Sequence, residues 1–455
     1  MLTVGSDTVA DYNAAIDFIF SRINFERAVG RSWSHTDLRP DRMARFLELL
    51  GDPHLRIPTI HVAGTKGKGS TSAMLASMLS ASGLRTGLFT SPHITVFEER
   101  MTVDGRPPCG NEFTELLNLC LDAIARLDAL DSRMSPTFFE IALAMAWLMF
   151  DRNDCNLAVL ETGLGGRLDA TNTCQPLLCI ITNISRDHTA ILGESTAQIA
   201  AEKAGIIKRQ VPVITGDVDP DADRAIEDAV VSNHSIRYRA NRDFDFDCTS
   251  RGRTAFAGET LDLRTPWRNW SQVHIPLTGE HQAANAALAI VAADYLDHGG
   301  YRITLEEARR GLDQLVWPLR FEVVDTNPTT IVDAAHNEAS VAAVVHTLRR
   351  RGVPENCVLV FAASRDKDAG AMLAHLMPDF RHIIFTRYTT NPRSAAPGDL
   401  ADLVDADLAH NLQLTDDPST ALATARRLAG SGGLICVTGS FFLAAEIRGL
   451  IVDER

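Results

Sequence analysis

The chain lacks the features that mark several classes of protein. Its eight cysteines include no Cys-x-x-Cys pair, so neither a zinc module nor a dithiol redox centre is indicated. We therefore expect reduced thiols and a cytoplasmic protein. No basic flank followed by an apolar core opens the sequence, so no signal peptide is predicted. The longest apolar run, residues 138–150, is interrupted by Glu140 and is too short to span a bilayer, so we expect a buried helix and no membrane partner.

Composition and charge narrow the function further. The 455 residues are enough for two or three domains, and 45% hydrophobic with 22% charged residues is typical of a soluble globular protein. The net charge of -14 argues against a general nucleic-acid binder, because neutralising phosphates requires a basic surface. Local basic pockets remain compatible with this balance. Internal repeats and low-complexity tracts are absent.

One stretch, residues 59–70, carries the clearest chemical signal. An apolar, strand-like run breaks at Gly64 into glycines around Lys68, and a helix is predicted to follow. Glycines let successive backbone N–H groups point into one concavity, and the helix start adds its positive dipole end. The spacing departs from the usual G-x-x-x-x-G-K-S/T, with an extra glycine before Ser70. A simple glycine-rich turn is the alternative, but strand, glycines, lysine, hydroxyl and helix follow in the order of a triphosphate site.

Two further strands are predicted to bring metal-binding groups to the same edge of a sheet. Residues 156–161 form a continuous apolar run ending in Glu161, and residues 177–183 precede His188. A third predicted strand, residues 85–90, ends at Ser91, where a plain surface turn is an equal alternative. A lone histidine is more often structural. Together with Glu161 and a serine hydroxyl, however, it forms a set of groups suited to Mg²⁺.

The remainder of the first part is predicted to contain two helices and an insert. Residues 195–205 have a serine cap and a glycine stop. Lys203 lies in the last turn, where the helix dipole favours a cation, so a simple charge at the helix end accounts for it. Residues 217–268 are more polar and predict an antiparallel insert. An alanine-rich helix follows from residue 279, and its conspicuous polar member Asn285 could be a packing amide.

A second α/β unit is predicted after a hinge at residues 317–320. Strand-like runs at 330–332, 358–361, 382–385 and 434–438 alternate with helical spans. Residues 333–337 follow the first of these strands, where function usually lies in this architecture. The predicted fold is therefore α/β: a P-loop-type, mostly parallel domain at 1–316 with a small antiparallel insert, then a smaller Rossmann-like domain at 317–455.

These motifs resemble those of the folylpolyglutamate synthase/dihydrofolate synthase family, a branch of the ATP-dependent Mur ligase superfamily, over nearly the full chain. The segments that carry the resemblance are residues 63–70, 90–93, 160–169, 187–188, 202–205, 319–322 and 333–337. Two departures are visible: Lys66 replaces a commoner asparagine, and residues 317–320 replace a more usual Pro-Gly-Arg. Neither removes a group that the chemistry requires.

The resemblance implies roles for particular residues. Those expected to bind ATP are Thr65, Lys66, Gly67, Lys68, Gly69, Ser70, Asn285, Arg320 and Asp333. Ser91, Glu161 and His188 match positions that hold Mg²⁺, and Lys203 matches a lysine that is carbamylated. Thr137, Phe138, Phe139, Glu140, Leu168, Asp169 and Ala170 match the pocket for the pterin-bearing substrate. Lys68, Lys203, Arg320 and His336 are the expected catalytic residues.

The predicted reaction joins L-glutamate to dihydropteroate, to tetrahydrofolate polyglutamate, or to both, through an acyl phosphate. Lys68 would stabilise the transferring phosphoryl group, and Arg320 would complete the charge clamp when the domains close. His336 is a candidate to orient or deprotonate the amine, and Asp333 is a weaker one. Two alternatives stay open: a peptidoglycan-type Mur ligase acting on a uridine-nucleotide sugar, and a catalytically silent ATP-binding protein. We expect a monomer whose ligands are ATP, Mg²⁺ and small-molecule substrates.

Overall fold

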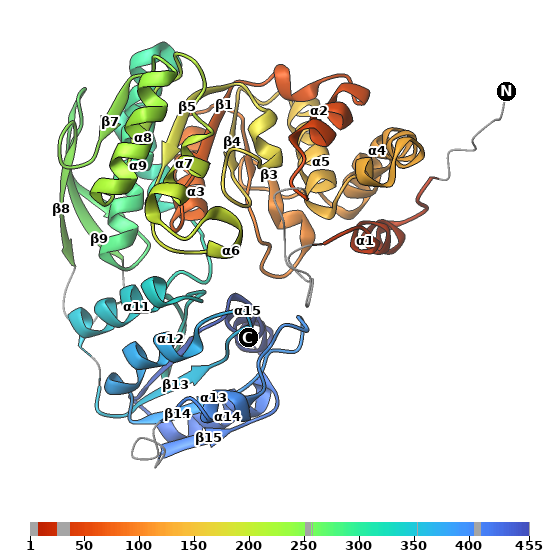
Figure 1. The fold of residues 1–455 in the computed structure, drawn as a ribbon. Coiled ribbons are helices and arrows are strands. Elements are labelled where there is room, and N and C mark those ends of the chain that lie inside the picture. Colours follow the sequence, from red (N-terminus) through yellow and green to blue (C-terminus); the bar gives the residue numbers. More distant parts are fainter. Residues whose placement is uncertain are drawn as a thin grey trace.

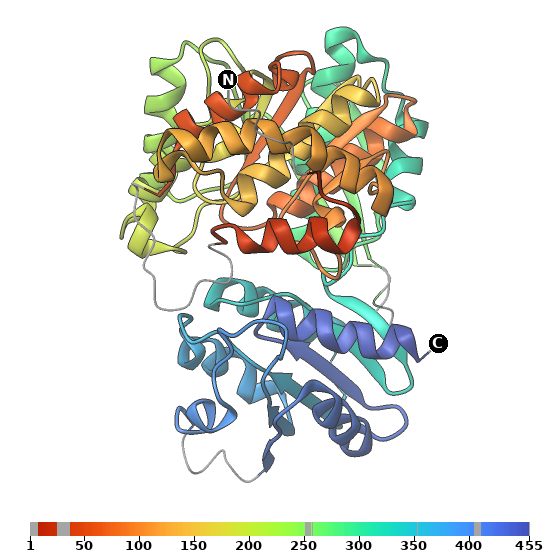
Figure 2. The same cartoon turned by 90° about the vertical axis from the view of Figure 1, so that its right-hand side faces the viewer.

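The protein has two lobes that meet along one side (Figures 1 and 2). The computed structural model describes residues 8–24, 37–250, 256, 258–352, 354–404 and 411–454. The larger lobe comes first in the chain, and the smaller one begins after the stretch that contains Trp317. The assignment of domains to 1–316 and 317–455 remains a prediction.

The larger lobe is built on a seven-stranded sheet in the order β3-β2-β4-β1-β5-β6-β7. Its strands are β1 (Thr59–Ala63), β2 (Thr86–Phe89), β3 (Met101–Val103), β4 (Leu157–Glu161), β5 (Pro176–Ile181), β6 (Val213–Thr215) and β7 (Arg237–Arg239). Only β3 runs antiparallel to its neighbour. Every residue of β1 and β4 is buried, as expected of central strands covered on both faces. The predicted strands at 59–63, 85–90, 156–161 and 177–183 are confirmed.

Helices cover both faces of this sheet. On one side α3 (Lys68–Ala81) packs against α9 (Glu280–Leu296) and α10 (Leu305–Asp313). Those on the other side are α1 (Tyr12–Ser21), α2 (Pro40–Leu49), α4 (Gly110–Leu130) and α5 (Phe138–Arg152). Near β5 and β6 lie α6 (Thr189–Leu192), α7 (Thr196–Ala204) and α8 (Pro220–Ser232). Because side chains alternate along β1, Ile60 and Val62 enter the core beneath α3 and α9. The buried helix predicted at 138–150 is confirmed as α5.

The antiparallel insert is smaller than the sequence predicts. It consists of β8 (Asp245–Ser250), β9 (Glu259–Arg264) and β10 (Asn269–Ile275). The expectation that it begins near residue 217 is wrong, because α8 and β7 continue the main sheet, with β7 parallel to β6. This edge strand is polar since its arginines pair with acidic side chains of α8: Arg237 lies 2.6 Å from Asp223.

The smaller lobe contains a six-stranded sheet in the order β11-β12-β16-β13-β14-β15. Its strands are β11 (Glu322–Thr326), β12 (Thr329–Val332), β13 (Cys357–Phe361), β14 (His382–Phe385), β15 (Leu412–Leu414) and β16 (Leu434–Thr438). Its helices are α11 (Glu338–Arg351), α12 (Ala369–Leu376), α13 (Pro397–Ala401), α14 (Pro418–Ala429) and α15 (Phe441–Asp453). Residues 333–337 follow the second strand, not the first as predicted. The missed first strand, β11, is a partly exposed edge paired antiparallel to β12.

Helix α11 connects the lobes at both of its ends. At its C-terminus, the buried Arg351 guanidinium lies 2.8 Å from the Glu259 carboxylate on β9 of the larger lobe. At its N-terminus, Asn337 donates to Asp187 of the larger lobe over 2.9 Å. Polar contacts at both ends of α11 therefore link the two lobes.

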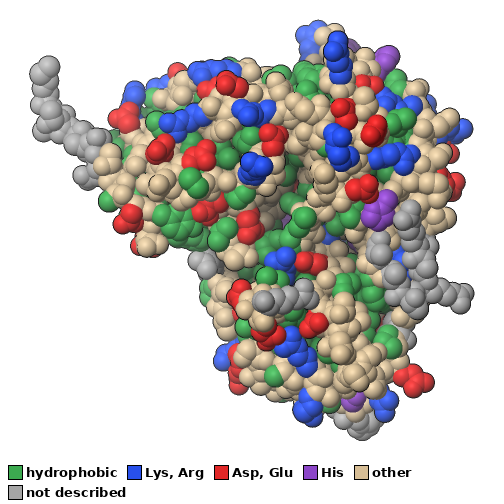
Figure 3. Space-filling view, turned by 180° about the vertical axis from the view of Figure 1, so that it is seen from behind, with side chains coloured by type: hydrophobic (Ala, Val, Ile, Leu, Met, Phe, Trp, Pro, Cys, Tyr) green, Lys and Arg blue, Asp and Glu red, His purple; other side chains and the backbone are tan. Residues whose placement is uncertain are grey.

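Short 3₁₀ turns occur at Pro53–Leu55, Phe97–Arg100, Ser132–Met134, Ala170–Thr173 and Met377–Asp379, and a π turn occurs at Asp297–Tyr301. Within the described ranges, none of the helices has the length and apolar character needed to cross a bilayer. Acidic and basic side chains are interspersed on the face seen from behind (Figure 3).

Candidate functional site

The phosphate loop predicted from the sequence joins β1 to α3. Gly67 precedes the helix with a φ of +80°, a backbone conformation that favours glycine. A Cβ atom at Gly67 would lie 2.1 Å from the Asn285 Oδ1 atom. The loop is fastened from β5, because the Asn183 side chain accepts a hydrogen bond from the Lys66 amide over 2.9 Å. Helix α3 thus begins at a tight glycine turn next to Asn285 of α9, and a helix start of this kind can bind a phosphate.

Glu161 lies beside this loop, next to Lys68 and Ser91. Its Oε1 atom is 4.0 Å from the Lys68 Nζ, and its Oε2 atom accepts from the Ser91 amide over 3.1 Å. Burial raises the pKa of Glu161, whereas Lys68 and the Ser91 amide act in the opposite direction. A carboxylate next to a phosphate cradle suits Mg²⁺, which binds through one or two carboxylates together with phosphate oxygens and water. The structure therefore brings Lys68 and Ser91 to Glu161, and the metal-binding role of Ser91 and Glu161 remains a prediction.

His188 follows β5 and lies beside Asp187. Its imidazole is about half exposed, and its Nε2 atom lies 3.8 Å from Asp187 Oδ1. Burial nevertheless lowers its pKa to about 4, so the ring is neutral near pH 7 and able to act as a ligand. Among the described residues no group of three or more His, Cys, Asp or Glu side chains could hold a metal. The role of His188 as a third metal ligand remains a prediction.

Asp187, which was not among the site residues predicted from the sequence, is the centre of a cluster of charged and polar side chains. Its Oδ2 atom lies 2.7 Å from the Lys66 Nζ and accepts from Asn337 over 2.9 Å, and its Oδ1 atom lies 3.2 Å from the Lys367 Nζ. Burial alone would raise the pKa of Asp187, but Lys66, His188 and Lys367 together hold it well below its usual range. We call Lys66, Asp187, Asn337 and Lys367 the Asp187 cluster. Since Asn337 and Lys367 come from the smaller lobe, the cluster joins the two lobes.

The Lys66 ammonium is therefore directed at Asp187. Burial lowers the pKa of Lys66 to about 8 although Asp187 acts in the opposite direction. His336 lies next to it: Nδ1 donates to the Ala334 carbonyl over 2.9 Å, and Nε2 is 3.4 Å from the Lys66 Nζ. The nearby charge of Lys66, followed by burial, lowers the pKa of His336 well below its ordinary value. Such an imidazole is a weak base, which favours orienting the amine over deprotonating it.

Lys203 is not an exposed charge at a helix end, since only 4% of it is accessible. Its Nζ donates to the Gly64 carbonyl at the start of the phosphate loop over 2.8 Å. Burial, with repulsion from Lys68, lowers the pKa of Lys203 to about 7. A large fraction of neutral amine at physiological pH is what reaction with carbon dioxide requires.

Asn285 borders a cavity next to the phosphate loop. The cavity has a volume of about 220 Å³, and its walls include Thr182, Phe244, Phe246 and Leu288. Asn285 donates to Gln282 over 3.1 Å, which fixes the orientation of the amide. Phenylalanine and leucine walls, together with polar groups that include the oriented Asn285 amide, suit a flat heteroaromatic ring such as adenine.

Arg320 is presented by a strained hinge. Leu319 and Phe321 on either side have φ values of 58° and 51°, in the left-handed region that bulky residues avoid. Asp333 holds this geometry, because its two oxygens accept from the Phe321 and Ala335 amides over 2.8 Å each. Burial lowers the pKa of Arg320, and Asp333 and Glu161 oppose that effect. The Arg320 guanidinium therefore interacts electrostatically with Glu161 of the larger lobe and Asp333 of the smaller lobe. Both carboxylate oxygens of Asp333 already accept hydrogen bonds from backbone amides.

The two predicted pterin segments meet at Gly163. A Cβ atom there would lie 2.8 Å from the Phe139 ring and 3.3 Å from Asp169 Oδ2. Thr137 and Glu140 instead cap α5 in a capping box, and Glu140 also pairs with Arg42 at 2.7 Å. Phe138 is buried in an aromatic cluster. Phe139 and Asp169 are thus the members of these segments that meet at Gly163, and the role of both segments remains a prediction.

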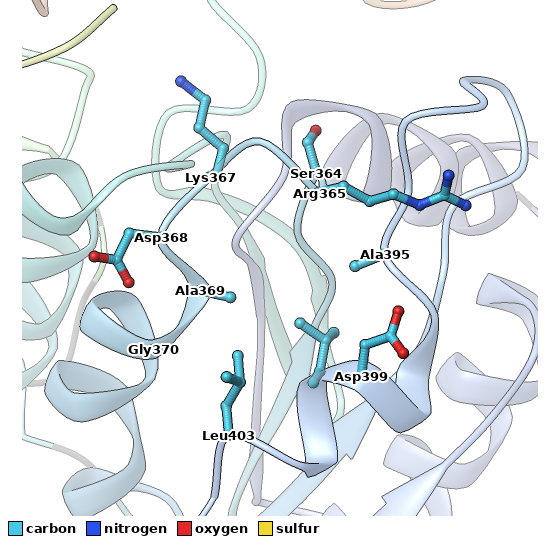
Figure 4. A pocket seen from close by; sticks show the side chains of 10 residues that line it. Ser364, Arg365, Lys367, Asp368, Ala369, Gly370, Ala395, Asp399 and Leu403 are labelled. Carbon is cyan, nitrogen blue, oxygen red and sulfur yellow. The ribbon is translucent and has the colours of Figure 1, made fainter. Parts of the chain in front are cut away.

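A larger cavity of about 430 Å³ lies in the smaller lobe, between α12 and α13. Figure 4 shows that the side chains of Arg365 and Lys367 point away from the space between Ala369 and Ala395. This cavity coincides with none of the predicted site residues, and Lys367 extends from its rim to the Asp187 cluster.

Comparison with known proteins identifies the family. The Mur ligase middle domain matches residues 62–293, and the Mur ligase glutamate ligase domain matches residues 319–441. The dihydrofolate synthase/folylpolyglutamate synthase of Bacillus subtilis is 36% identical over 427 residues, which cover 92% of this chain and 97% of that protein. The chain belongs to the Mur ligase family, in its folylpolyglutamate synthase/dihydrofolate synthase branch. The resemblance inferred from the sequence motifs is confirmed.

Solved structures of this branch have the same fold. Mycobacterium tuberculosis folylpolyglutamate synthase, crystallised with ADP and AMPPCP, aligns with a TM-score of 0.87 at 29% identity, covering 97% of this chain and 99% of that one. The Escherichia coli FolC complex with DHPP and ADP aligns with a TM-score of 0.83 at 25% identity, covering 98% and 99%. The predicted α/β fold class of this Mur ligase family member is thereby confirmed.

Three residues of the Asp187 cluster were not predicted as site residues, although two of them belong to motifs recognised in the sequence. Asp187 and Asn337 both stand inside quoted motifs, but neither has a role that can be assigned without knowing the partner across the lobe boundary. Lys367 is in a polar loop with no recognisable spacing. Only the packing of the two lobes of this Mur ligase family member brings these three side chains together.

Proposed function

We propose that the protein is an ATP-dependent ligase that adds L-glutamate to dihydropteroate, to tetrahydrofolate polyglutamate, or to both. The observation that carries this proposal is that Lys68 and the Ser91 amide lie against the buried Glu161 carboxylate at the phosphate loop, with Arg320 of the hinge within electrostatic reach of Glu161. Binding of ATP is supported by the nucleotides in the related crystal structures.

ATP activates the carboxylate of the acceptor substrate, which is otherwise a poor electrophile. Its phosphates lie on the loop amides and its adenine lies in the cavity beside Asn285. The carboxylate attacks the γ-phosphorus in line, and Lys68 stabilises the charge on the transferring group. Glu161 and Ser91, with His188 as the third ligand, would hold Mg²⁺, which would supply further neutralisation of phosphate charge. ADP departs, and the acceptor carboxylate is now an acyl phosphate. The amine of L-glutamate attacks this intermediate, and phosphate is released.

The lobe boundary protects and completes this reaction. Arg320 adds a positive charge from the hinge, and closure around it excludes water from the acyl phosphate. His336, held by the Ala334 carbonyl, orients the incoming amine through its Nε2 atom. Carbamylation of Lys203 converts a buried cation into an anion next to the loop. This modification is supported by the depressed pKa of Lys203, about 7.

Three wider expectations accompany this function. The protein acts as a monomer, in the cytoplasm, on small molecules. The support for the compartment is that all eight cysteines are free thiols.

The deciding experiment measures phosphate release by the purified protein with ATP and L-glutamate, offering dihydropteroate and tetrahydrofolate in parallel. Release with both acceptors identifies a bifunctional enzyme, and release with one assigns the branch. If the protein is folded and binds ATP but releases no phosphate with either acceptor, the proposal is refuted. The Mur ligase that acts on a uridine-nucleotide sugar is then the function to test.

A further inference from the structure

A buried hydrogen-bonded chain leads from the central strand of the larger lobe to Asp169. His61 is in the middle of β1 and is fully buried. Its Nε2 atom lies 2.8 Å from the Thr171 hydroxyl, and that hydroxyl donates to Asp169 Oδ1 over 2.5 Å. Thr171 is also fully buried. Water does not compete for either bond, so both contribute more than they would at the surface.

The direction of the chain follows from the number of protons. A hydroxyl has one hydrogen, and Thr171 uses it on a carboxylate that can only accept. The Thr171 oxygen must therefore accept from His61, which fixes the proton of the imidazole on Nε2. Burial lowers the pKa of His61 to about 3, in agreement with a neutral ring. The other nitrogen, Nδ1, is buried and has no partner.

The far end of the chain is the buried Asp169 carboxylate. Asp169 Oδ1 receives the Thr171 amide over 3.0 Å as well as its hydroxyl, so this oxygen is occupied. Asp169 Oδ2 accepts from the Leu164 amide over 2.8 Å and faces Gly163 next to Phe139. A carboxylate oxygen has capacity for a second donor. Oδ2 therefore has capacity for one further N–H donor on the side where Phe139 lies.

An imidazole is an unusual residue for this position. A strand buried on both faces is normally filled by Val, Ile or Leu, and a polar group there costs free energy unless it is bonded. Thr59, two residues earlier in β1, uses its hydroxyl on the Ile57 carbonyl nearby. His61, by contrast, reaches a residue 110 positions later, in the segment that holds Asp169.

We propose that His61 is a positioning residue for the acceptor substrate, acting through Thr171 to orient the Asp169 carboxylate toward an N–H donor edge of a heteroaromatic ring. This inference rests on the proposed function, because it needs the acceptor to bind at Asp169. It assigns no contact between His61 and the substrate.

Conservative and disruptive substitutions separate this role from simple packing. His61→Gln keeps a terminal N–H donor, and His61→Leu removes it. Thr171→Ser keeps the hydroxyl, and Thr171→Val removes it. His54→Leu is the matched control, because His54 is also buried with an unpartnered Nδ1 but lies in a turn beside Trp147.

Steady-state phosphate release is measured with ATP, L-glutamate and the acceptor varied separately. His61→Leu and Thr171→Val are expected to raise the KM for the acceptor about tenfold or more, with the KM for ATP changed by less than about threefold. His61→Gln, Thr171→Ser and His54→Leu are expected to stay within about threefold of the unmodified protein for every constant. The double variant of His61→Leu with Thr171→Val is expected to match the single variants, because both break one chain.

Three results overturn the inference while leaving the proposed function intact: an acceptor KM for His61→Leu equal to that of His54→Leu, parallel loss of every kinetic constant, or failure of His61→Gln to rescue. If His61→Leu does not fold, the Thr171→Val and Thr171→Ser pair gives the same decision. An unmodified protein that releases no phosphate with either acceptor overturns the proposed function, and this inference with it.

Discussion

Replacing Asp187 by asparagine tests whether the Asp187 cluster holds the lobes together. The substitution keeps the shape of the side chain but leaves Lys66 and Lys367 without their shared negative charge. Only 9% of the Asp187 side chain is exposed, against 23% for Lys66 and 15% for Lys367. Removing one partner of a fully buried ion pair costs about 3–5 kcal/mol. With the partial exposure of the lysines, we expect a loss of about 2–3 kcal/mol in the free energy of unfolding.

Urea denaturation at pH 7 measures this loss, and Asp151→Asn is the control. Asp151 pairs with Arg56 at 2.6 Å, but their side chains are 28% and 57% exposed. An exposed pair contributes less than about 1 kcal/mol. Small-angle scattering adds a direct measure, because the radius of gyration increases if the lobes separate. The Arg351–Glu259 contact remains, so the lobes should loosen and not come apart entirely.

The pH dependence of the effect has a definite sign. The folded-state pKa of Asp187 is held well below its ordinary value of 3.8. Its contribution is therefore fully present above about pH 4 and is lost as the pH falls through the folded-state pKa. The difference between the unmodified protein and Asp187→Asn should shrink as the pH falls below about 4. Equal losses for Asp187→Asn and Asp151→Asn at pH 7, with an unchanged radius of gyration, would refute the role assigned to the cluster.

Three further predictions concern the phosphate loop and its neighbours. Lys68→Ala should lower phosphate release by at least about 100-fold while leaving the urea midpoint almost unchanged, and near-normal turnover would remove Lys68 from the mechanism. Gly67→Ala should weaken ATP binding by more than about tenfold in calorimetry, because its Cβ atom would lie 2.1 Å from Asn285 Oδ1; unaltered binding would contradict the assignment of Asn285. Lys203 binds a proton in the unfolded chain but not in the folded one between about pH 7 and its ordinary pKa of 10.5. In bicarbonate-free buffer, stability should therefore rise with pH across this window by up to about 1.4 kcal/mol per pH unit relative to Lys203→Met, and parallel pH profiles would show that Lys203 has an ordinary pKa.

Local pattern was sufficient to predict the strands that build the site. The run ending in Glu161 is apolar because its strand is covered on both faces. The glycines around Lys68 indicate a loop, because Gly64 and Gly67 have positive φ values that favour glycine. Edge strands were missed or misassigned for the converse reason. β7 and β11 have one free edge and partly exposed side chains, so they lack the continuous apolar pattern by which central strands are recognised.

The sequence by itself determined the chemistry that is available and the order in which it occurs along the chain. Lysine, carboxylate and hydroxyl each come at the end of a predicted strand. Because the ends of parallel strands meet at one edge of a sheet, these groups can be placed near one another without coordinates. Tertiary structure alone decided which partner each side chain binds. Lys66 is directed to Asp187 and not into the cradle, both Asp333 oxygens bind backbone, and His61 reaches Thr171 across 110 residues. These contacts depend on packing between distant segments, where burial and hydrogen bonding are settled together and no spacing in the sequence records them.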